Sequence, residues 1–146
     1  MAILQTATTS FKTELAQGLH NFGPSSPDTF KIALFTGSAE LSASTTAYTP
    51  GMSGEVVGTG YTAGGETLVI DQAPTTAPNG VVAYWSFANA TWSPAAFTAR
   101  GALIYNSTNG NRSVCVLDFG SDKTATTTFT VQFPAVTSTS AILRIS

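Results

Sequence analysis

Residues 98–119 read TARGALIYNSTNGNRSVCVLDF, and this stretch decides the fold. Two apolar runs, at 102–105 and 114–117, flank a polar centre that contains the dipeptide Asn109-Gly110. Asn-Gly is the dipeptide that best supplies two residues of positive φ for a tight turn between antiparallel strands. The stretch therefore predicts a β-hairpin with Asn109 and Gly110 as its turn residues.

The pairing that follows from this turn makes both faces of the hairpin apolar. One face pairs Leu103 with Val116 and Tyr105 with Val114, and the other pairs Ile104 with Cys115 and Ala102 with Leu117. A surface hairpin has one polar face, so this hairpin should be covered on both sides. The core of the domain covers one face. A local helix or loop, or another protein, covers the other, and we expect the helix at 10–21 or a neighbouring subunit there.

The segment from Ser10 to about Asn21 has the only convincing helical pattern. Phe11, Leu15 and Leu19 recur at intervals of four residues and form one apolar stripe. A helix this short is stable only if its stripe packs on another surface. That surface is either a sheet of the same domain or a partner protein.

The rest of the chain predicts short strands separated by turns. Strands are expected at 28–35, 81–88, 128–133 and 141–145, with two more between 54 and 70; residues 1–9 form an arm or edge strand, 71–80 a loop, 89–97 a bend and 120–125 a turn. Together with the hairpin, this gives about eight strands in one domain at 1–146. The expected architecture is all-β, an antiparallel β-sandwich of jelly-roll or Greek-key type with one short N-terminal helix.

The segment at 38–53, SAELSASTTAYTPGMS, is longer than most connections between strands, and such loops often carry function. Tyr48 and Met52 are the side chains with which it can grip another surface, although both can equally belong to a small satellite core. The candidate partner interface consists of Phe11, Leu15, Tyr48, Met52 and Trp92.

Charged residues are scarce. They make up 10% of the 146 residues, against about 25% in an average soluble domain, and the net charge is −2. The six basic residues are scattered, which predicts no nucleic-acid binding, and no apolar run is long enough to predict a membrane span or a secretory signal. Ser and Thr take the place of charges. This composition favours a protein packed into a larger assembly, although Thr-rich strands also occur in monomeric β-proteins.

Residues for catalysis or metal binding are sparse. A catalytic triad would have to use His20, the only histidine, and no GxSxG motif accompanies it. Cys115 reads as a small buried hydrophobic residue. The eight carboxylates are scattered, and Asp118 with Asp122 is weak evidence for a calcium loop. We predict no enzymatic activity, no catalytic residue, no cofactor and no metal.

Four stretches of the chain carry a family resemblance. They are SFKTELAQGLHNF at 10–22, DTFKIALFTGSAELSASTTAYT at 28–49, GEVVGTGYTAGGETL at 54–68 and FTARGALIYNSTNGNRSVCVLDFGSDKTAT at 97–126. In this order they resemble a family of small virion proteins of tailed bacteriophages. The resemblance spans almost the whole chain, and the region at 71–96 is the least typical.

The resemblance implies a non-enzymatic structural protein of the virion. Some members are similar to capsid cement (decoration) proteins, which place a jelly-roll domain on the outside of an icosahedral shell. The implied partners are the major capsid protein, whose neighbouring subunits the chain would bridge, and further copies of itself in a dimer or trimer. The implied location is the capsid exterior, after synthesis in the host cytoplasm.

The alternative function is a tail or fibre component that binds the host surface or a glycan. Six aromatic residues are candidates for stacking on sugars, although on alternating strands they equally read as core: Tyr48, Tyr61, Tyr84, Trp85, Trp92 and Tyr105. Binding to shells or to host glycans separates the two functions.

Overall fold

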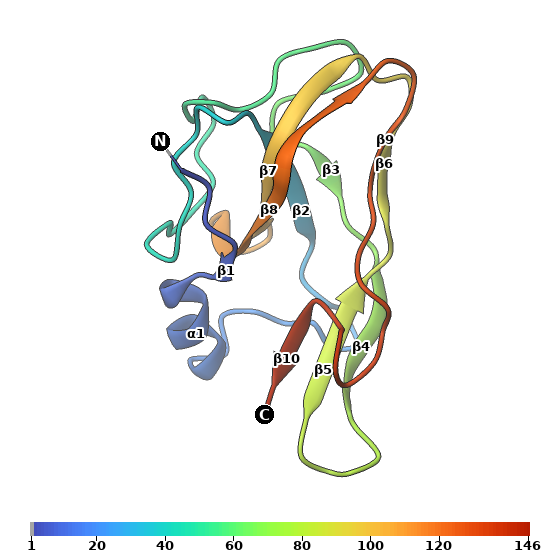
Figure 1. The fold of residues 1–146 in the computed structure, drawn as a ribbon. Coiled ribbons are helices and arrows are strands. Elements are labelled where there is room, and N and C mark those ends of the chain that lie inside the picture. The colour runs from blue at the N-terminus through green and yellow to red at the C-terminus, as the bar shows by residue number, and fades with distance from the viewer. Residues whose placement is uncertain (1) are drawn as a thin grey trace.

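A computed structural model describes residues 2–146 as two packed layers of antiparallel strands with one short helix (Figure 1). The elements are β1 (Thr6–Ala7), α1 (Thr9–Ala16), β2 (Phe30–Phe35), β3 (Glu66–Thr67), β4 (Ile70–Thr76), β5 (Ala83–Phe87), β6 (Ala90–Trp92), β7 (Phe97–Asn106), β8 (Arg112–Ala125), β9 (Phe129–Val131) and β10 (Leu143–Ile145). One layer is a five-stranded sheet in the order β1-β8-β7-β2-β3. The other consists of the sheets β10-β5-β4 and β6-β9. The predicted all-β fold with one N-terminal helix is confirmed.

The hairpin β7–β8 lies in the larger sheet, and β2 pairs with β7, on the side away from β8, over six residues. Three of its predicted pairs are confirmed, namely Leu103 with Val116, Ile104 with Cys115, and Ala102 with Leu117. The fourth is wrong, because the register shifts after Ile104 and Tyr105 lies opposite Ser113.

The predicted two-residue turn is also wrong. The hairpin loop spans 107–111, and its residues of positive φ are Gly110 (68°) and Asn111 (57°). The side-chain oxygen of Asn106 explains the wider loop, because it accepts hydrogen bonds from the backbone N–H groups of Thr108 (3.1 Å) and Asn109 (3.2 Å). Such Asx contacts stabilise a turn that begins earlier than the Asn-Gly dipeptide.

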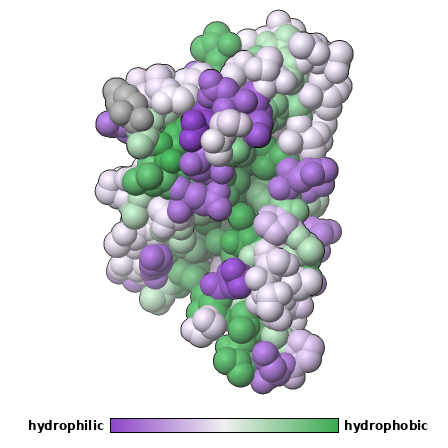
Figure 2. Space-filling model, in the orientation of Figure 1, coloured by the Kyte–Doolittle hydropathy of each residue, from purple (hydrophilic) through white to green (hydrophobic). Residues whose placement is uncertain are grey.

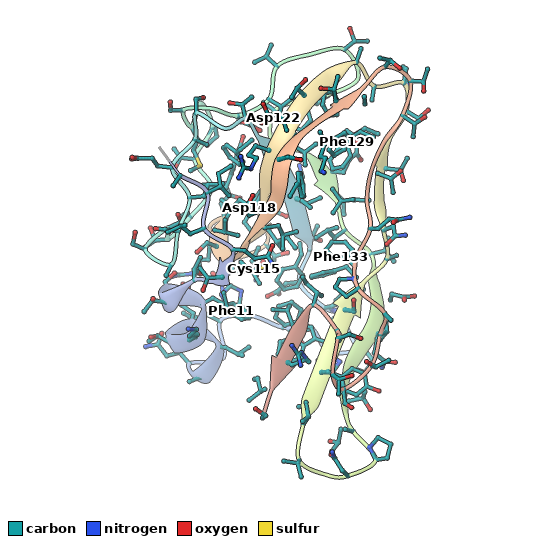
Figure 3. The ribbon with its side chains drawn as sticks, in the orientation of Figure 1. Phe11, Cys115, Asp118, Asp122, Phe129 and Phe133 are labelled. Carbon is teal, nitrogen blue, oxygen red and sulfur yellow. The ribbon has the colours of Figure 1, made fainter. Side chains whose placement is uncertain are left out.

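Both faces of the hairpin are covered, as predicted, but the second cover differs from the expected one. One face packs in the main core between the layers, where Ile104, Val114 and Cys115 meet the aromatic residues of the other sheets. Figure 3 shows Cys115 and Phe133 facing this interior from opposite layers. The N-terminal arm and the loop at 36–55 cover the other face, instead of the helix or a neighbouring subunit.

This second core is small and well packed. It contains Leu103, Tyr105 and Val116 of the hairpin with Ala33 and Phe35 of β2; the cover supplies Ile3, Ala39, Leu41 and Tyr48, with Met52 at its margin. Tyr48 stacks on Tyr105 with ring centroids 4.6 Å apart. The apolar side chains of the loop therefore cover the face of the hairpin that the helix was expected to cover.

Helix α1 is shorter than the predicted 10–21. The side chain of Thr8 caps its first turn by accepting from the N–H of Phe11, and Gly18, with φ of 75°, follows its end. The helix packs beside β8 through buried Phe11 and Glu14, and Leu15 is half-buried against the main core.

Several strand boundaries also differ from expectation. The segment at 71–80 was expected to be a loop, but most of it forms β4, a polar edge strand with register shifts around Ala73 and Pro74. The bend at 89–97 contains β6, paired with β9, and β8 continues through the predicted turn at 120–125. Of the two strands expected between 54 and 70, the second is present as β3, and single bridges at Glu55 and Thr59 take the place of the first. Edge strands need little apolar alternation, so the pattern does not reveal them.

Candidate partner-binding surface

The carboxylates, the histidine and the thiol form no metal-binding cluster among the described residues. Within 2–146 no three His, Cys, Asp or Glu side chains lie close enough to hold a metal ion. Cys115 is buried, and burial raises the pKa of its thiol to about 12, so it is an unreactive thiol at neutral pH. Asp118 forms a partly buried ion pair with Arg100 (3.0 Å) and accepts from the N–H of Gly120 instead of joining Asp122 in a loop site.

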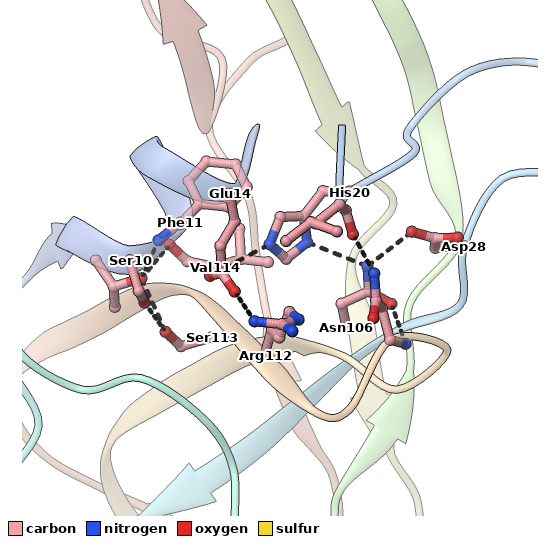
Figure 4. A network of polar contacts seen from close by, with 12 residues as sticks. Ser10, Phe11, Glu14, His20, Asp28, Asn106, Arg112, Ser113 and Val114 are labelled. Atoms are coloured by element: carbon pink, nitrogen blue, oxygen red, sulfur yellow. Dashed lines mark hydrogen bonds and ion pairs between the residues drawn. The ribbon is translucent and has the colours of Figure 1, made fainter. Parts of the chain in front are cut away.

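A buried polar network joins α1 to the end of the hairpin (Figure 4). One carboxylate oxygen of Glu14 accepts from the guanidinium of Arg112, and the other lies 3.7 Å from Nε2 of His20. Nδ1 of His20 lies 3.1 Å from the amide nitrogen of Asn106, which also donates to Asp28 (2.7 Å). Since the imidazole faces no cleft, these contacts position the helix.

A second polar cluster holds the loops next to the hairpin. The carboxylate of Glu55 accepts from the hydroxyls of Tyr48 (3.0 Å) and Tyr61 (2.8 Å) and from the N–H of Gly64 (2.7 Å). The hydroxyl of Tyr105 donates to the carbonyl of Gly64 (2.6 Å). Burial, the hydrogen bond to Glu55 and its charge raise the pKa of Tyr48 to about 12, so this phenol keeps its proton and donates at neutral pH.

Three of the five predicted interface residues belong to the core. Phe11 is 3% exposed, Tyr48 6% and Trp92 1%, so these side chains offer no surface to a partner in the folded domain. Leu15 and Met52 are half-buried and reach the surface. The structure does not bring the five residues together, because Trp92 packs against Phe97 and Phe129 in the main core while Tyr48 lies in the second core.

The segment at 42–47 is tied to the sheet by the backbone and by one serine. The hydroxyl of Ser113 donates to the carbonyl of Thr45 (2.7 Å), and its N–H donates to the carbonyl of Thr46 (2.9 Å). The N–H of Tyr48 donates to the carbonyl of Asn111 (2.9 Å). The outer side of this segment is therefore held at fixed positions.

Two adjoining hollows lie on this outer side. One, of about 520 Å³, lies between the N-terminal arm and the long loop, and the other, of about 570 Å³, between the loop, α1 and the hairpin tip. Both are lined by Thr46 and Ala47, so they form one continuous surface, which we call the loop face. The loop face consists of Ala2, Leu4, Ser10, Thr13, Glu14, Glu40, Leu41, Ser42, Ser44, Thr45, Thr46, Ala47, Met52, Gly110 and Arg112.

The loop face is rich in small and hydroxyl side chains and poor in charge. Glu40 is its one acidic residue outside the Glu14–Arg112 ion pair, and Leu4, 58% exposed, is its most prominent apolar side chain. The sequence indicated the 38–53 segment and Met52, but it did not single out Thr46 or Ala47 within that segment, and it did not indicate Leu4. Small residues on a surface have no periodic pattern that would reveal them.

Other exposed apolar residues are scattered. They are Val57, Val69, Val81 and Ile145. Figure 2 shows apolar residues along the seam between the two layers, interrupted by polar ones. A shallow groove of about 420 Å³ lies near this seam, with Phe119 and Phe129 at its base and Lys123 and Gln132 among its polar lining residues. The groove is open and has no charged or metal-binding cluster.

The aromatic residues considered for sugar stacking are mostly internal. Trp85, Trp92, Tyr48 and Tyr105 are buried, at 6% exposure or less, and Tyr61 and Tyr84 are partly exposed. A glycan platform needs an exposed aromatic face, and the buried four have none.

Comparisons with known proteins find no matching family model, no matching curated protein and no matching solved structure. Among residues 2–146 no helix has the length and apolar character required to cross a membrane.

Proposed function

We propose that this chain is a capsid cement protein of a tailed bacteriophage, which binds the outside of the major capsid protein shell and bridges neighbouring subunits. The proposal starts from the resemblance of the four sequence blocks to small phage virion proteins. The observation that carries it further is the loop face, a continuous, weakly charged surface held by backbone hydrogen bonds to the sheet.

The physical properties of the loop face suit this role. A surface of hydroxyl and small apolar groups binds with little dependence on salt, because few ion pairs contribute. Its segments are already fixed in the folded chain, so binding requires little ordering of the loop. Many copies across a shell add their individual contributions at the subunit joints, and weak single contacts then suffice.

Cosedimentation with purified, expanded empty shells tests the function. We expect the protein to bind shells at a fixed stoichiometry of many copies per shell, and to bind neither host cells nor glycans. Absence of shell binding, or a copy number of only a few per virion, contradicts the proposal. Binding to cells or glycans without shells supports the tail or fibre alternative.

A matched pair of variants tests the surface separately from the function. Leu4→Asp places a charge on the loop face, and Val81→Asp makes the same kind of change at a residue of similar exposure, 67% against 58%, in the loop between β4 and β5. We expect Leu4→Asp to weaken shell binding at least about tenfold, and Val81→Asp to leave it unchanged. If Val81→Asp weakens shell binding and Leu4→Asp does not, the shell-binding surface lies at the β4–β5 end instead of the loop face, and the proposed cement function still holds.

A further inference from the structure

His20 is a buried histidine with both aromatic and polar neighbours. Its side chain is completely buried, and its ring packs edge-on against Phe11, with centroids 5.0 Å apart, and beside Phe22 and Phe30. It follows α1 in the chain and contacts Asn106 at the end of β7, so it joins two segments 86 residues apart (Figure 4).

The orientation of Asn106 determines which ring nitrogen of His20 carries the proton. Its side-chain oxygen is engaged by the N–H groups of Thr108 and Asn109, so its amide nitrogen must face Nδ1 of His20 and the carboxylate of Asp28. An amide nitrogen only donates, and Nδ1 must therefore accept. The proton of the neutral ring lies on Nε2 and points toward Oε1 of Glu14, 3.7 Å away.

A protonated ring does not fit this arrangement. An N–H at Nδ1 would face the N–H group of Asn106, and two donors repel. Rotation of the Asn106 amide would remove that clash, but its NH₂ would then face the two backbone N–H groups and its oxygen would face the Asp28 carboxylate. Every orientation of Asn106 leaves buried donors or acceptors without partners, which is costly.

Charged groups approach His20 from three elements. Glu14 of α1 and Asp28 of the segment before β2 favour the charged ring, whereas Arg112 of β8 disfavours it. Burial opposes the charged ring more strongly than the carboxylates favour it, and the pKa of His20 is lowered from 6.5. Asp28 is already engaged by Asn106 and the N–H of Asn21, and one oxygen of Glu14 is engaged by Arg112. The other oxygen of Glu14 has no hydrogen-bond partner and faces Nε2 of His20 at 3.7 Å.

We propose that His20 is an acid-sensitive latch, which holds α1 and the segment that follows it on the hairpin tip while its ring is neutral, and releases them when it is protonated. Release would break the contacts of Asn106 with His20 and Asp28, and the bond from the Asn109 side chain to the carbonyl of Leu19 (2.7 Å). Phe11 and Phe22, which these segments contribute to the main core, would be exposed by release. The pairing of β7 with β2 and β8 at Leu103 and Ile104 lies outside this junction, so opening at the latch is confined to one end of the sheet.

The sign of the pH effect follows from the neutral ring. The folded protein disfavours the protonated ring of His20. The contribution of the neutral ring to the free energy of unfolding is therefore fully present above pH 6.5, and it is lost as the pH falls from there toward the lowered pKa of the folded state. Within that window the unfolding equilibrium constant rises by up to about tenfold per pH unit from this group.

NMR of the wild-type protein tests the latch directly, since His20 is the only histidine and its signals need no assignment by mutation. We expect the ring nitrogen shifts to show a neutral ring protonated at Nε2, with titration below pH 6.5. The amide protons of Thr108 and Asn109 should lose protection, corrected for intrinsic exchange rates, together with His20 protonation, while Leu103 and Ile104 retain theirs. A proton on Nδ1 at neutral pH, a titration at or above pH 6.5, or protonation without loss of protection overturns the proposal.

The variant His20→Asn gives a second measurement, because asparagine retains a side-chain acceptor and does not titrate. We expect it to be less stable at all pH values, since the ring leaves a void, but to lose less stability than the wild type as the pH falls below 6.5. An equal pH dependence in the two proteins contradicts the latch, and the wild-type NMR measurement stands if the variant does not fold.

Discussion

Gly65 lies where the chain enters β3, directly against the backbone of β2. Its φ is +76°, and a methyl group at this position would lie 1.7 Å from the carbonyl oxygen of Ile32 and 2.8 Å from Cα of Ala33. Both atoms belong to the backbone of the sheet, so neither can rotate away as a side chain would. Gly65→Ala must therefore push β3 off β2, to which it is paired at two positions.

The expected loss of stability has two parts. The positive φ costs alanine about 1 kcal/mol. Displacement also breaks two hydrogen bonds of Gly64, from its N–H to Glu55 (2.7 Å) and from the Tyr105 hydroxyl to its carbonyl (2.6 Å), each worth about 1 kcal/mol. The free energy of unfolding should fall by about 3 kcal/mol, a large share of the roughly 5–15 kcal/mol typical of a domain.

Gly18 provides the matched control. Its φ is +75°, almost the same as that of Gly65, but a methyl group there meets no atom within 4 Å. Gly18→Ala should therefore cost only the backbone part, about 1 kcal/mol. Urea unfolding followed by tryptophan fluorescence measures both variants. If the two lose the same stability, the close approach of Gly65 to β2 has no energetic consequence and the reasoning is refuted.

Three further predictions concern buried groups. Tyr105→Phe leaves the carbonyl of Gly64 without its donor and should lower the free energy of unfolding by about 1–2 kcal/mol; urea unfolding with no change would show that this bond contributes nothing. Cys115, whose pKa burial raises to about 12, should react with a disulfide reagent only in denaturant, and rapid reaction of the native protein would contradict its burial. Trp92→Ala should cost about 3–5 kcal/mol by leaving a cavity, and a thermal or urea midpoint close to wild type would place this ring outside the core.

The sequence predicts the features that depend on local alternation. The two apolar runs around Asn109-Gly110 predict the hairpin, its central pairs and the burial of both faces, and β2 and β9 follow from the same period. β4 has no such alternation, because it is a polar edge strand, and the Asx contacts of Asn106 that widen the hairpin loop depend on side-chain geometry. For the candidate site, the length of the 38–53 segment indicates where a surface lies, but its small residues do not indicate which ones form it.

The sequence by itself therefore determines an all-β domain built around a hairpin that must be covered on both sides. Only the tertiary structure decides that the arm and the 36–55 loop provide the second cover, that Tyr48 and Trp92 are internal, and that His20 meets Asn106. An apolar pattern indicates that a face is buried away from water, and many segments could cover such a face equally well. The choice among them depends on shape and on hydrogen bonds between residues far apart in the chain, and those arise only when the segments are packed together.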